Sequence, residues 1–220
     1  MSLEVTRFIN RNVCVDKVWV TKDVWLSSGD MYGLPDFCFE VINEPLTDET
    51  SYSDIIVYLI NKYKCKNYLE IGISVLKNLY QVASNTKTNI VAFDINKLNP
   101  CITLPRPFQF IKGNVVIPED WRPLKDLSLK HDFIFSDALH HNDGLQAEFD
   151  NYIKDHLADK WIIIWDDAWD NPTEYIKKNL IPVLNKKYGS LYIHKMMVQE
   201  WIPNQHHPIL IVSNYPLEIC

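Results

Sequence analysis

The chain has 220 residues, of which 47% are hydrophobic, and its formal net charge is −6. This size suits one domain with its own core, and the negative charge argues against a nucleic-acid binder, which would need a basic stripe. No apolar run reaches the roughly 18 residues of a membrane-spanning helix. Five scattered cysteines without a C-x-x-C pair favour reduced thiols, so we expect a cytoplasmic protein that contacts neither membrane nor nucleic acid.

The first 66 residues contain no legible site motif. Alternating stretches at 12–20 and 24–26 favour a hairpin or an extended arm. Thr47 and Asp48 can cap a helix that runs to about residue 64. We expect residues 1–66 to cover the sheet, to shape a substrate pocket or to make a homo-oligomer contact.

From residue 67 to the end, strand-like and helix-like stretches alternate. Strands are predicted at 67–71, 89–94, 108–112, 132–136 and 160–165. Helices are predicted at 75–84, about 119–128, 143–157 and 171–188. This order is typical of an α/β fold with a parallel sheet and helices on both faces, and it predicts one domain over 67–220.

The last part of the chain changes character. Pro182 should kink or split the predicted 171–188 helix, because proline lacks the N–H that a helix interior needs. Two strand-like runs follow, at 190–198 and 208–213. They predict a terminal antiparallel pair, one member of which enters the sheet.

Gly72 follows the first predicted core strand, and Ser74 can cap the helix after it. A helix N-terminus offers free N–H groups, and a glycine lets a ligand approach the backbone, so this corner suits a nucleotide. Asp94 ends the next strand and lies 22 residues after Gly72, a spacing that suits a ribose-binding acid. A single glycine is a weak fingerprint, and an ordinary β–α turn is the alternative.

The other predicted strands also end in polar residues. Asn114 follows the third strand, Asp137 follows the fourth, and Asp166 and Asp167 follow the fifth. Open α/β sheets bind ligands at the carboxyl ends of their strands. Carboxylates held close together repel unless a cation joins them, and oxygen ligands favour Mg²⁺, Mn²⁺ or Ca²⁺. The sequence therefore predicts a divalent metal site at this edge.

Other polar residues near these strand ends allow more than one interpretation. Asp170 is expected to cap the helix that begins near Pro172. His140 could act as a general base or ligate a metal, and a solvent-exposed histidine is the alternative. The His206-His207 pair could approach the rim of the site, although its spacing does not indicate this.

The segment from about 67 to 213 resembles the class I S-adenosylmethionine-dependent methyltransferases. The resemblance rests on Tyr-Leu-Glu-Ile-Gly at 68–72, Val-Ala-Phe-Asp at 91–94, Phe-Ile-Lys-Gly-Asn at 110–114 and Asp-Phe-Ile-Phe-Ser-Asp at 132–137. It implies a three-layer α/β/α Rossmann-like fold with a seven-stranded, mostly parallel sheet and a terminal antiparallel strand. It also implies that S-adenosylmethionine is bound by Glu70, Gly72, Ser74, Asp94, Asn114 and Asp137.

The segment from His131 to Asp167 is similar to a branch that methylates small molecules and includes macrolide-sugar O-methyltransferases. Asp137, His140, Gly144 and the Asp166-Asp167 pair match its motif positions. The resemblance implies Asp137, Asp166 and Asp167 as ligands of Mg²⁺ or another divalent cation, and His140 and Asp137 as catalytic residues. The activity implied is methyl transfer to a hydroxyl of a small-molecule acceptor.

The sequence departs from that pattern in two places. Ser74, Leu76 and Lys77 stand where small residues are common after the first motif, and Ala138 and Leu139 follow Asp137 where a glycine is expected. These departures leave open a weak or inactive methyltransferase-fold binding module, in which residues 1–66 hold a partner. A metal-dependent hydrolase is a third hypothesis, and it leaves Gly72 and Asp94 without a role.

Overall fold

The computed structural model describes residues 5–7, 52–73, 77–96, 104–199 and 206–219. Its strands are β1 (Val5–Arg7), β2 (Asn67–Ile71), β3 (Asn89–Asp94), β4 (Gln109–Lys112), β5 (His131–Ser136), β6 (Leu157–Trp165), β7 (Tyr192–Gln199) and β8 (His206–Ser213). Its α-helices are α3 (Tyr52–Tyr63), α4 (Lys77–Asn85), α5 (Arg122–Asp126), α6 (Asn142–Asn151), α7 (Asp170–Tyr175) and α8 (Ile181–Tyr188). None of these helices combines the length and the apolar character needed to cross a membrane.

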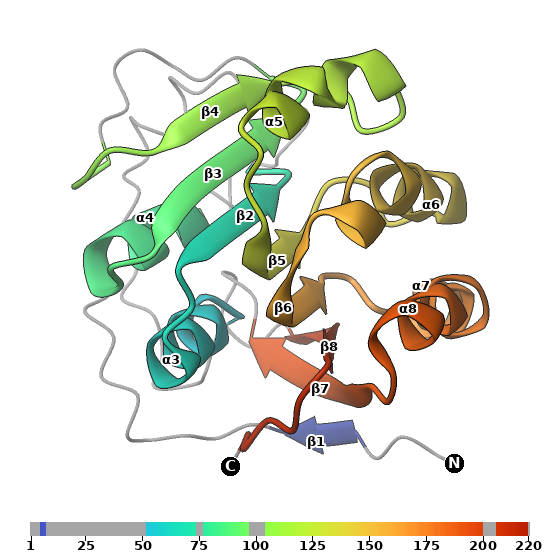
Figure 1. Cartoon of the computed structure of the whole chain (residues 1–220). Coiled ribbons are helices and arrows are strands. Elements are labelled where there is room, and N and C mark those ends of the chain that lie inside the picture. Colours follow the sequence, from blue (N-terminus) through green and yellow to red (C-terminus); the bar gives the residue numbers. More distant parts are fainter. Residues whose placement is uncertain (1–4, 8–51, 74–76, 97–103, 200–205, 220) are drawn as a thin grey trace, which may run out of the picture.

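The described strands form one twisted sheet in the order β1-β7-β8-β6-β5-β2-β3-β4 (Figure 1). β8 alone among them runs against its neighbours β6 and β7, and the other pairings are parallel. The predicted seven-stranded, mostly parallel sheet with an antiparallel terminal strand is confirmed. β1 adds a short eighth strand from the N-terminal segment. The hairpin or arm predicted at 12–26 lies outside the described residues.

Helices cover both faces of the sheet (Figure 1). On one face, α3 and α4 pack over Tyr68, Phe133 and Phe135 in a core of buried side chains. On the other face, α5 to α8 pack over a second core that includes Trp121 and Trp161. Helix α3 thus covers one face of the sheet, which is one of the roles that we expected for residues 1–66. The division of the chain at residue 66 stays a prediction.

Two predicted helices end differently in the structure. The helix predicted over 143–157 stops at Asn151, and a 3₁₀ turn (Ile153–Asp155) leads into β6, which begins at Leu157 because that residue pairs with His131. The helix predicted over 171–188 is split by a π-helical segment (Ile176–Leu180) that ends two residues before Pro182. A widened turn there accommodates the ring and missing N–H of the proline, so the predicted break is confirmed.

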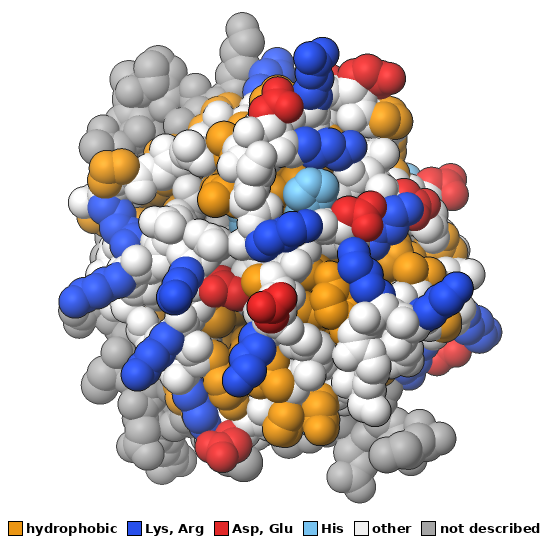
Figure 2. Space-filling view, viewed as in Figure 1, with side chains coloured by type: hydrophobic (Ala, Val, Ile, Leu, Met, Phe, Trp, Pro, Cys, Tyr) orange, Lys and Arg blue, Asp and Glu red, His pale blue; other side chains and the backbone are white. Residues whose placement is uncertain are grey.

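Lysine and arginine side chains spread over the face shown in Figure 2, with acidic side chains among them. Several lysines form ion pairs on the surface. The pairs are Lys62–Glu218 at 3.1 Å, Lys154–Asp150 at 2.8 Å and Lys187–Asp155 at 3.3 Å. Exposed pairs of this kind contribute about 0–1 kcal/mol each, so they have little influence on the fold.

Candidate functional site

The strand order reverses between β2 and β5. β3 and β4 continue the sheet on the β2 side, and β6 continues it on the β5 side. Backbone hydrogen bonds extend past the strand ends here: Gly72 N–H donates to Phe93 O at 2.8 Å and Asp137 N–H donates to Ile71 O at 2.7 Å. Such a reversal opens a crevice at the carboxyl edge, which is where α/β sheets place ligands.

Gly72 has no room for a side chain. Its φ is +82°, and a Cβ atom would lie 2.2 Å from the Asp137 carbonyl oxygen. Only glycine combines this backbone conformation with such close packing against a neighbouring strand end. The turn predicted at this position is therefore confirmed, and it brings the ends of β2 and β5 into close backbone contact.

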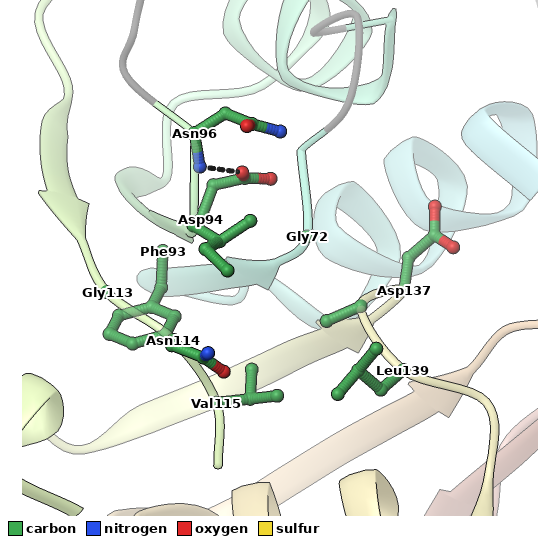
Figure 3. Close-up of a pocket in the computed structure, with 11 residues that line it drawn as sticks. Gly72, Phe93, Asp94, Asn96, Gly113, Asn114, Val115, Asp137 and Leu139 are labelled. Atoms are coloured by element: carbon green, nitrogen blue, oxygen red, sulfur yellow. Dashed lines mark hydrogen bonds between the residues drawn. The ribbon is translucent and has the colours of Figure 1, made fainter. Parts of the chain in front are cut away.

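A cavity of about 220 Å³ lies at this turn (Figure 3). It is lined by Gly72, Phe93, Asp94, Ile95, Asn96, Gly113, Asn114, Val115, Asp137, Ala138 and Leu139. The lining therefore comes from the ends of β2, β3, β4 and β5. We call it the cofactor corner.

Asp94 is the acidic side chain of the cofactor corner best held in place. It is 8% exposed, and its two carboxylate oxygens accept hydrogen bonds from Ile73 N–H and Asn96 N–H, each at 2.7 Å. A carboxylate has about four acceptor sites, so Asp94 can still accept hydrogen bonds from a ligand. Across the cavity, Asn114 Oδ1 accepts from Val116 N–H at 3.1 Å, which fixes its amide.

Glu70 is placed away from the cavity. It is 1% exposed and accepts a hydrogen bond from the Tyr68 hydroxyl at 2.6 Å. Burial raises the pKa of Glu70 to about 8, against hydrogen bonds from Tyr68 and Asn78 that lower it. Glu70 therefore links β2 to α4 beneath the cofactor corner, and Ser74 lies outside the described residues.

Asp137 interacts with Asp166 and Asp167 next to the cofactor corner, but it is not among the possible ligand atoms that lie within 4.8 Å of one another, which come from Asp166, Asp167 and His207. His140 lies among these carboxylates: its Nε2 is 3.5 Å from Asp137 Oδ1 and 3.7 Å from Asp167 Oδ2. In Figure 3 the Asp137 backbone borders the cavity while its carboxylate points away from Asn114. Asp137 thus joins the cofactor corner to this cluster of carboxylates.

His207 also lies at this site, although its spacing in the sequence does not indicate this. His207 Nε2 lies 3.3 Å from Asp166 Oδ1, and Nδ1 lies 3.6 Å from Asp167 Oδ1. Its side chain is 5% exposed. The signal that could have found it is the antiparallel direction of β8, which brings the start of that strand to the carboxyl end of β6. Ala168 N–H donates to Pro208 O at 2.8 Å and fixes this contact. We call Asp137, Asp166, Asp167, His140 and His207 the acid corner.

The carboxylates of the acid corner have unlike environments. Burial and the negative charge of Asp166 raise the pKa of Asp137 well above its usual range. Burial also raises the pKa of Asp166, although the charge of His207 opposes this. A hydrogen bond from His207 lowers the pKa of Asp167. A divalent cation would remove the repulsion among these groups.

The backbone at Asp167 is strained. Its φ is +45°, in the left-handed region, and Trp169 N–H donates to Asp167 O at 2.7 Å across the tight turn. This conformation costs a non-glycine residue about 1–2 kcal/mol and often marks functional sites. It turns the Asp167 carboxylate toward both His140 and His207.

The donor atoms of the acid corner fit a metal ion. Ligand atoms of Asp166, Asp167 and His207 all lie within 4.8 Å of one another. Two ligands of a common ion, each about 2.0–2.3 Å from it, are separated by up to about 4.6 Å, so only small movements would be needed.

Two neighbouring residues lie at the margin of the site. Asp170 was expected to cap a helix beginning near Pro172, and this is wrong. Helix α7 begins at Asp170 itself, Trp169 occupies the cap position without a side-chain hydrogen bond, and Asp170 pairs with Lys195 at 3.3 Å. His141 is exposed and precedes α6.

No protein-family model matches the sequence, and no curated protein matches it. Its fold, however, matches solved structures. The O-methyltransferase from Bacillus cereus in complex with SAH superposes with a TM-score of 0.54 at 14% identity, covering 88% of this chain and 97% of that one. The chain has the class I methyltransferase fold.

Two further structures superpose on this methyltransferase fold. Cofactor-bound Rv0187 from MTB gives a TM-score of 0.55 at 12% identity over 86% of this chain and 87% of that one. The methyltransferase domain of bacterial CtHen1-CN gives 0.51 at 10% identity over 73% and 95%. At these identities the likeness concerns the fold.

Proposed function

We propose that the chain is an enzyme that transfers a methyl group from S-adenosylmethionine to a hydroxyl of a small-molecule acceptor, with a divalent metal assisting. The observation that carries the proposal is the cofactor corner. Gly72 lines the cavity where the strand order reverses, and Asp94 lies on the neighbouring strand with fixed carboxylate oxygens. This geometry occurs in a chain with the methyltransferase fold.

In this proposal, different residues of the cofactor corner bind different parts of S-adenosylmethionine. Asp94 accepts hydrogen bonds from the ribose hydroxyls, as a fixed acid at the end of the second core strand can. Asn114 and the apolar side chains of Phe93 and Ile95 flank the adenine. Gly72 lets the ligand approach the backbone. Glu70 supports β2 and α4 from beneath, and Ser74 stays a prediction.

The residues of the acid corner would serve the acceptor. Asp137, Asp166 and Asp167 would hold a divalent cation, which would supply positive charge to stabilise a developing oxyanion of the acceptor. His140 lies beside two of these carboxylates and is one-third exposed, so it can take the acceptor proton and release it to solvent. The sulfonium of bound S-adenosylmethionine supplies an activated methyl group. The chain then has to align acceptor and donor.

Two measurements on the full chain test this proposal. Calorimetry should detect S-adenosylhomocysteine binding, and radiolabelled S-adenosylmethionine should transfer its label to hydroxylated small molecules supplied as a panel with Mg²⁺ or Mn²⁺. A folded protein that binds no S-adenosylhomocysteine at millimolar concentration would remove the proposal.

A non-catalytic binding module on the same fold is the second candidate. Leu139 favours it, because its side chain stands at the cavity wall and narrows the room for a ligand (Figure 3). In that case Asp137→Ala would leave partner binding intact. Methyl transfer by the native chain that is lost in Asp137→Ala would exclude this candidate.

A further inference from the structure

We infer that His207 is a metal ligand of the acid corner, and that it tunes the site to a transition-metal dication such as Mn²⁺, Fe²⁺ or Co²⁺ over Mg²⁺. The inference rests on the proposed function, in which Asp137, Asp166 and Asp167 hold the cation. It adds a nitrogen ligand from a strand that carries none of these acids.

The position of His207 is fixed by the fold. β8 runs antiparallel to β6, with Trp165 opposite Leu210, and the Ala168–Pro208 hydrogen bond extends this pairing past the end of β6. On the other side, the His207 ring lies against Tyr52 of α3, with ring centroids 5.1 Å apart. The imidazole is therefore held on both sides, as a preorganised ligand must be.

Both ring nitrogens of His207 face carboxylates. Nε2 faces Asp166 and Nδ1 faces Asp167, at 3.3 and 3.6 Å. Asp166 is 6% exposed and His207 is equally buried, so water screens these groups poorly. A metal-ligating histidine commonly coordinates through one nitrogen and donates its other N–H to a carboxylate. The arrangement suits coordination through Nε2 beside Asp166, with Nδ1–H directed to Asp167.

The alternative role for His207 is that of a counter-ion. A doubly protonated imidazole between Asp166 and Asp167 would neutralise the two acids without any metal. The close grouping of donor atoms from Asp166, Asp167 and His207 favours a ligand, since their separations of up to 4.8 Å are close to the span of one cation's ligands. The carboxylates of Asp137 and Asp166 are also close enough to interact.

The ligand chemistry sets the metal preference. Mg²⁺ prefers oxygen ligands alone and keeps several waters. Imidazole nitrogen favours the later divalent ions, and a mixed set of carboxylates and one imidazole suits Mn²⁺, Fe²⁺ or Co²⁺ better than Mg²⁺.

Metal titration of the full chain tests the inference without an activity assay. Calorimetry with Mn²⁺ and with Mg²⁺ should show Mn²⁺ binding at least about tenfold more tightly. Pulsed electron paramagnetic resonance of the Mn²⁺ complex should show hyperfine coupling to a nitrogen. In His207→Gln that coupling should vanish and Mn²⁺ affinity should fall about 10–100-fold, with Mg²⁺ affinity changed less.

Three variants keep the test specific. His206→Gln is the matched control from the same doublet, and it should retain both the coupling and the Mn²⁺ affinity. His140→Gln should also retain the coupling, which assigns the nitrogen to His207. His207→Asp should restore an oxygen ligand and move the preference toward Mg²⁺. Circular dichroism and S-adenosylhomocysteine binding on the same samples confirm that each variant is folded.

Other outcomes would overturn the inference. Nitrogen coupling that persists in His207→Gln would show that His207 is no ligand, and equal binding of Mn²⁺ and Mg²⁺ would contradict the metal preference. Tighter metal binding in His207→Gln would identify His207 as the counter-ion. If no metal binds while S-adenosylhomocysteine does, the inference fails and the cofactor part of the proposed function stands.

Discussion

The cofactor corner and the acid corner lie side by side but are built differently. The cofactor corner depends on backbone: a glycine with positive φ, and an acid whose oxygens are held by two N–H groups. The acid corner depends on side chains that come from β5, β6 and β8 and lie within 4 Å of one another in pairs. A substitution that alters the backbone should therefore disrupt the cofactor corner. A substitution that removes a charge should disrupt the acid corner.

Each corner is backed by a buried glutamate. Glu70 lies beneath the cofactor corner, and Glu148 of α6 accepts a hydrogen bond from Ser136 just before Asp137. Burial raises the pKa of each to about 8. A buried glutamate thus lies next to each corner, although the residues that line the two corners differ.

The largest effect is expected for Gly72→Ala. The new Cβ would meet the Asp137 carbonyl, so we expect a loss of about 3 kcal/mol or more in unfolding free energy and no S-adenosylhomocysteine binding. Gly189→Ala is the matched control, because φ is +80° there but no atom lies within 4 Å of the new Cβ. It should cost about 1–2 kcal/mol and leave binding intact. If urea unfolding showed the same loss of unfolding free energy in Gly72→Ala and Gly189→Ala, close packing at Gly72 would be unimportant for stability.

Asp166→Asn should reveal the dependence of the acid corner on charge. We expect methyl transfer to fall about 100-fold or more, because a metal ligand and a negative charge are lost together. Affinity for S-adenosylhomocysteine should stay within about twofold, since Asp166 does not line the cofactor cavity. Asp170→Asn, at an exposed position beside the site, should change neither quantity. A parallel loss of cofactor affinity in Asp166→Asn would mean that the two corners are not separable.

Asp94→Asn tests the cofactor corner by removing a negative charge while keeping a side chain of nearly the same shape. We expect S-adenosylhomocysteine affinity to fall about 10–100-fold, as charge-assisted hydrogen bonds are weakened. Asp132→Asn is the matched control, because Asp132 also accepts two backbone N–H groups, at 2.6 and 2.8 Å, but at the opposite edge of the sheet. It should alter stability alone. Comparable losses of affinity by calorimetry in both variants would argue against a ribose-binding role for Asp94.

Glu148→Gln should be visible as a change in the pH dependence of stability. The pKa of Glu148 is about 8 in the folded state and about 4.5 in the unfolded state. Between these two pH values Glu148 is therefore protonated in the folded state and ionised in the unfolded state. The unfolding free energy of the native chain should therefore fall by about 1.4 kcal/mol per pH unit from this group between pH 4.5 and 8. The contribution is present below pH 4.5 and lost above pH 8.

In Glu148→Gln this component of the slope should disappear, because glutamine does not titrate. Denaturant unfolding between pH 5 and 8 measures it, and Glu70→Gln makes the same comparison behind the cofactor corner. An unchanged slope in Glu148→Gln would mean that Glu148 is ionised in the folded state at neutral pH.

The sequence predicted features that depend on a few neighbouring residues. The core strands follow from local hydrophobic runs, and Gly72 and Asp94 each end a strand, so both positions could be assigned from the pattern alone. Asp137, Asp166 and Asp167 could be grouped because parallel strands deliver their ends to one edge. The predicted helix over 143–157 ran too far because Tyr152 and Ile153 are buried like helix residues, but Tyr152 has a non-helical backbone and Ile153 begins a 3₁₀ turn.

His207 shows what the sequence could not predict. Its place depends on β8 pairing in the antiparallel sense with β6, a contact between residues 45 to 51 positions apart. Glu70 illustrates a different limit: it lies before the strand ends, on the face shared with Tyr68, while the cavity is lined by residues that follow the ends. Which face and which partner a side chain meets is decided by the tertiary structure.

A crystal structure of the full chain with S-adenosylhomocysteine and Mn²⁺ tests the central claim most directly. We predict adenosine density between Asp94 and Asn114, with the amino-acid end over Gly72, and an anomalous peak among Asp166, Asp167 and His207. Ligand density elsewhere, or crystals grown at saturating S-adenosylhomocysteine that show the crevice at Gly72 without it, would contradict the claim that this crevice is a methyl-donor site.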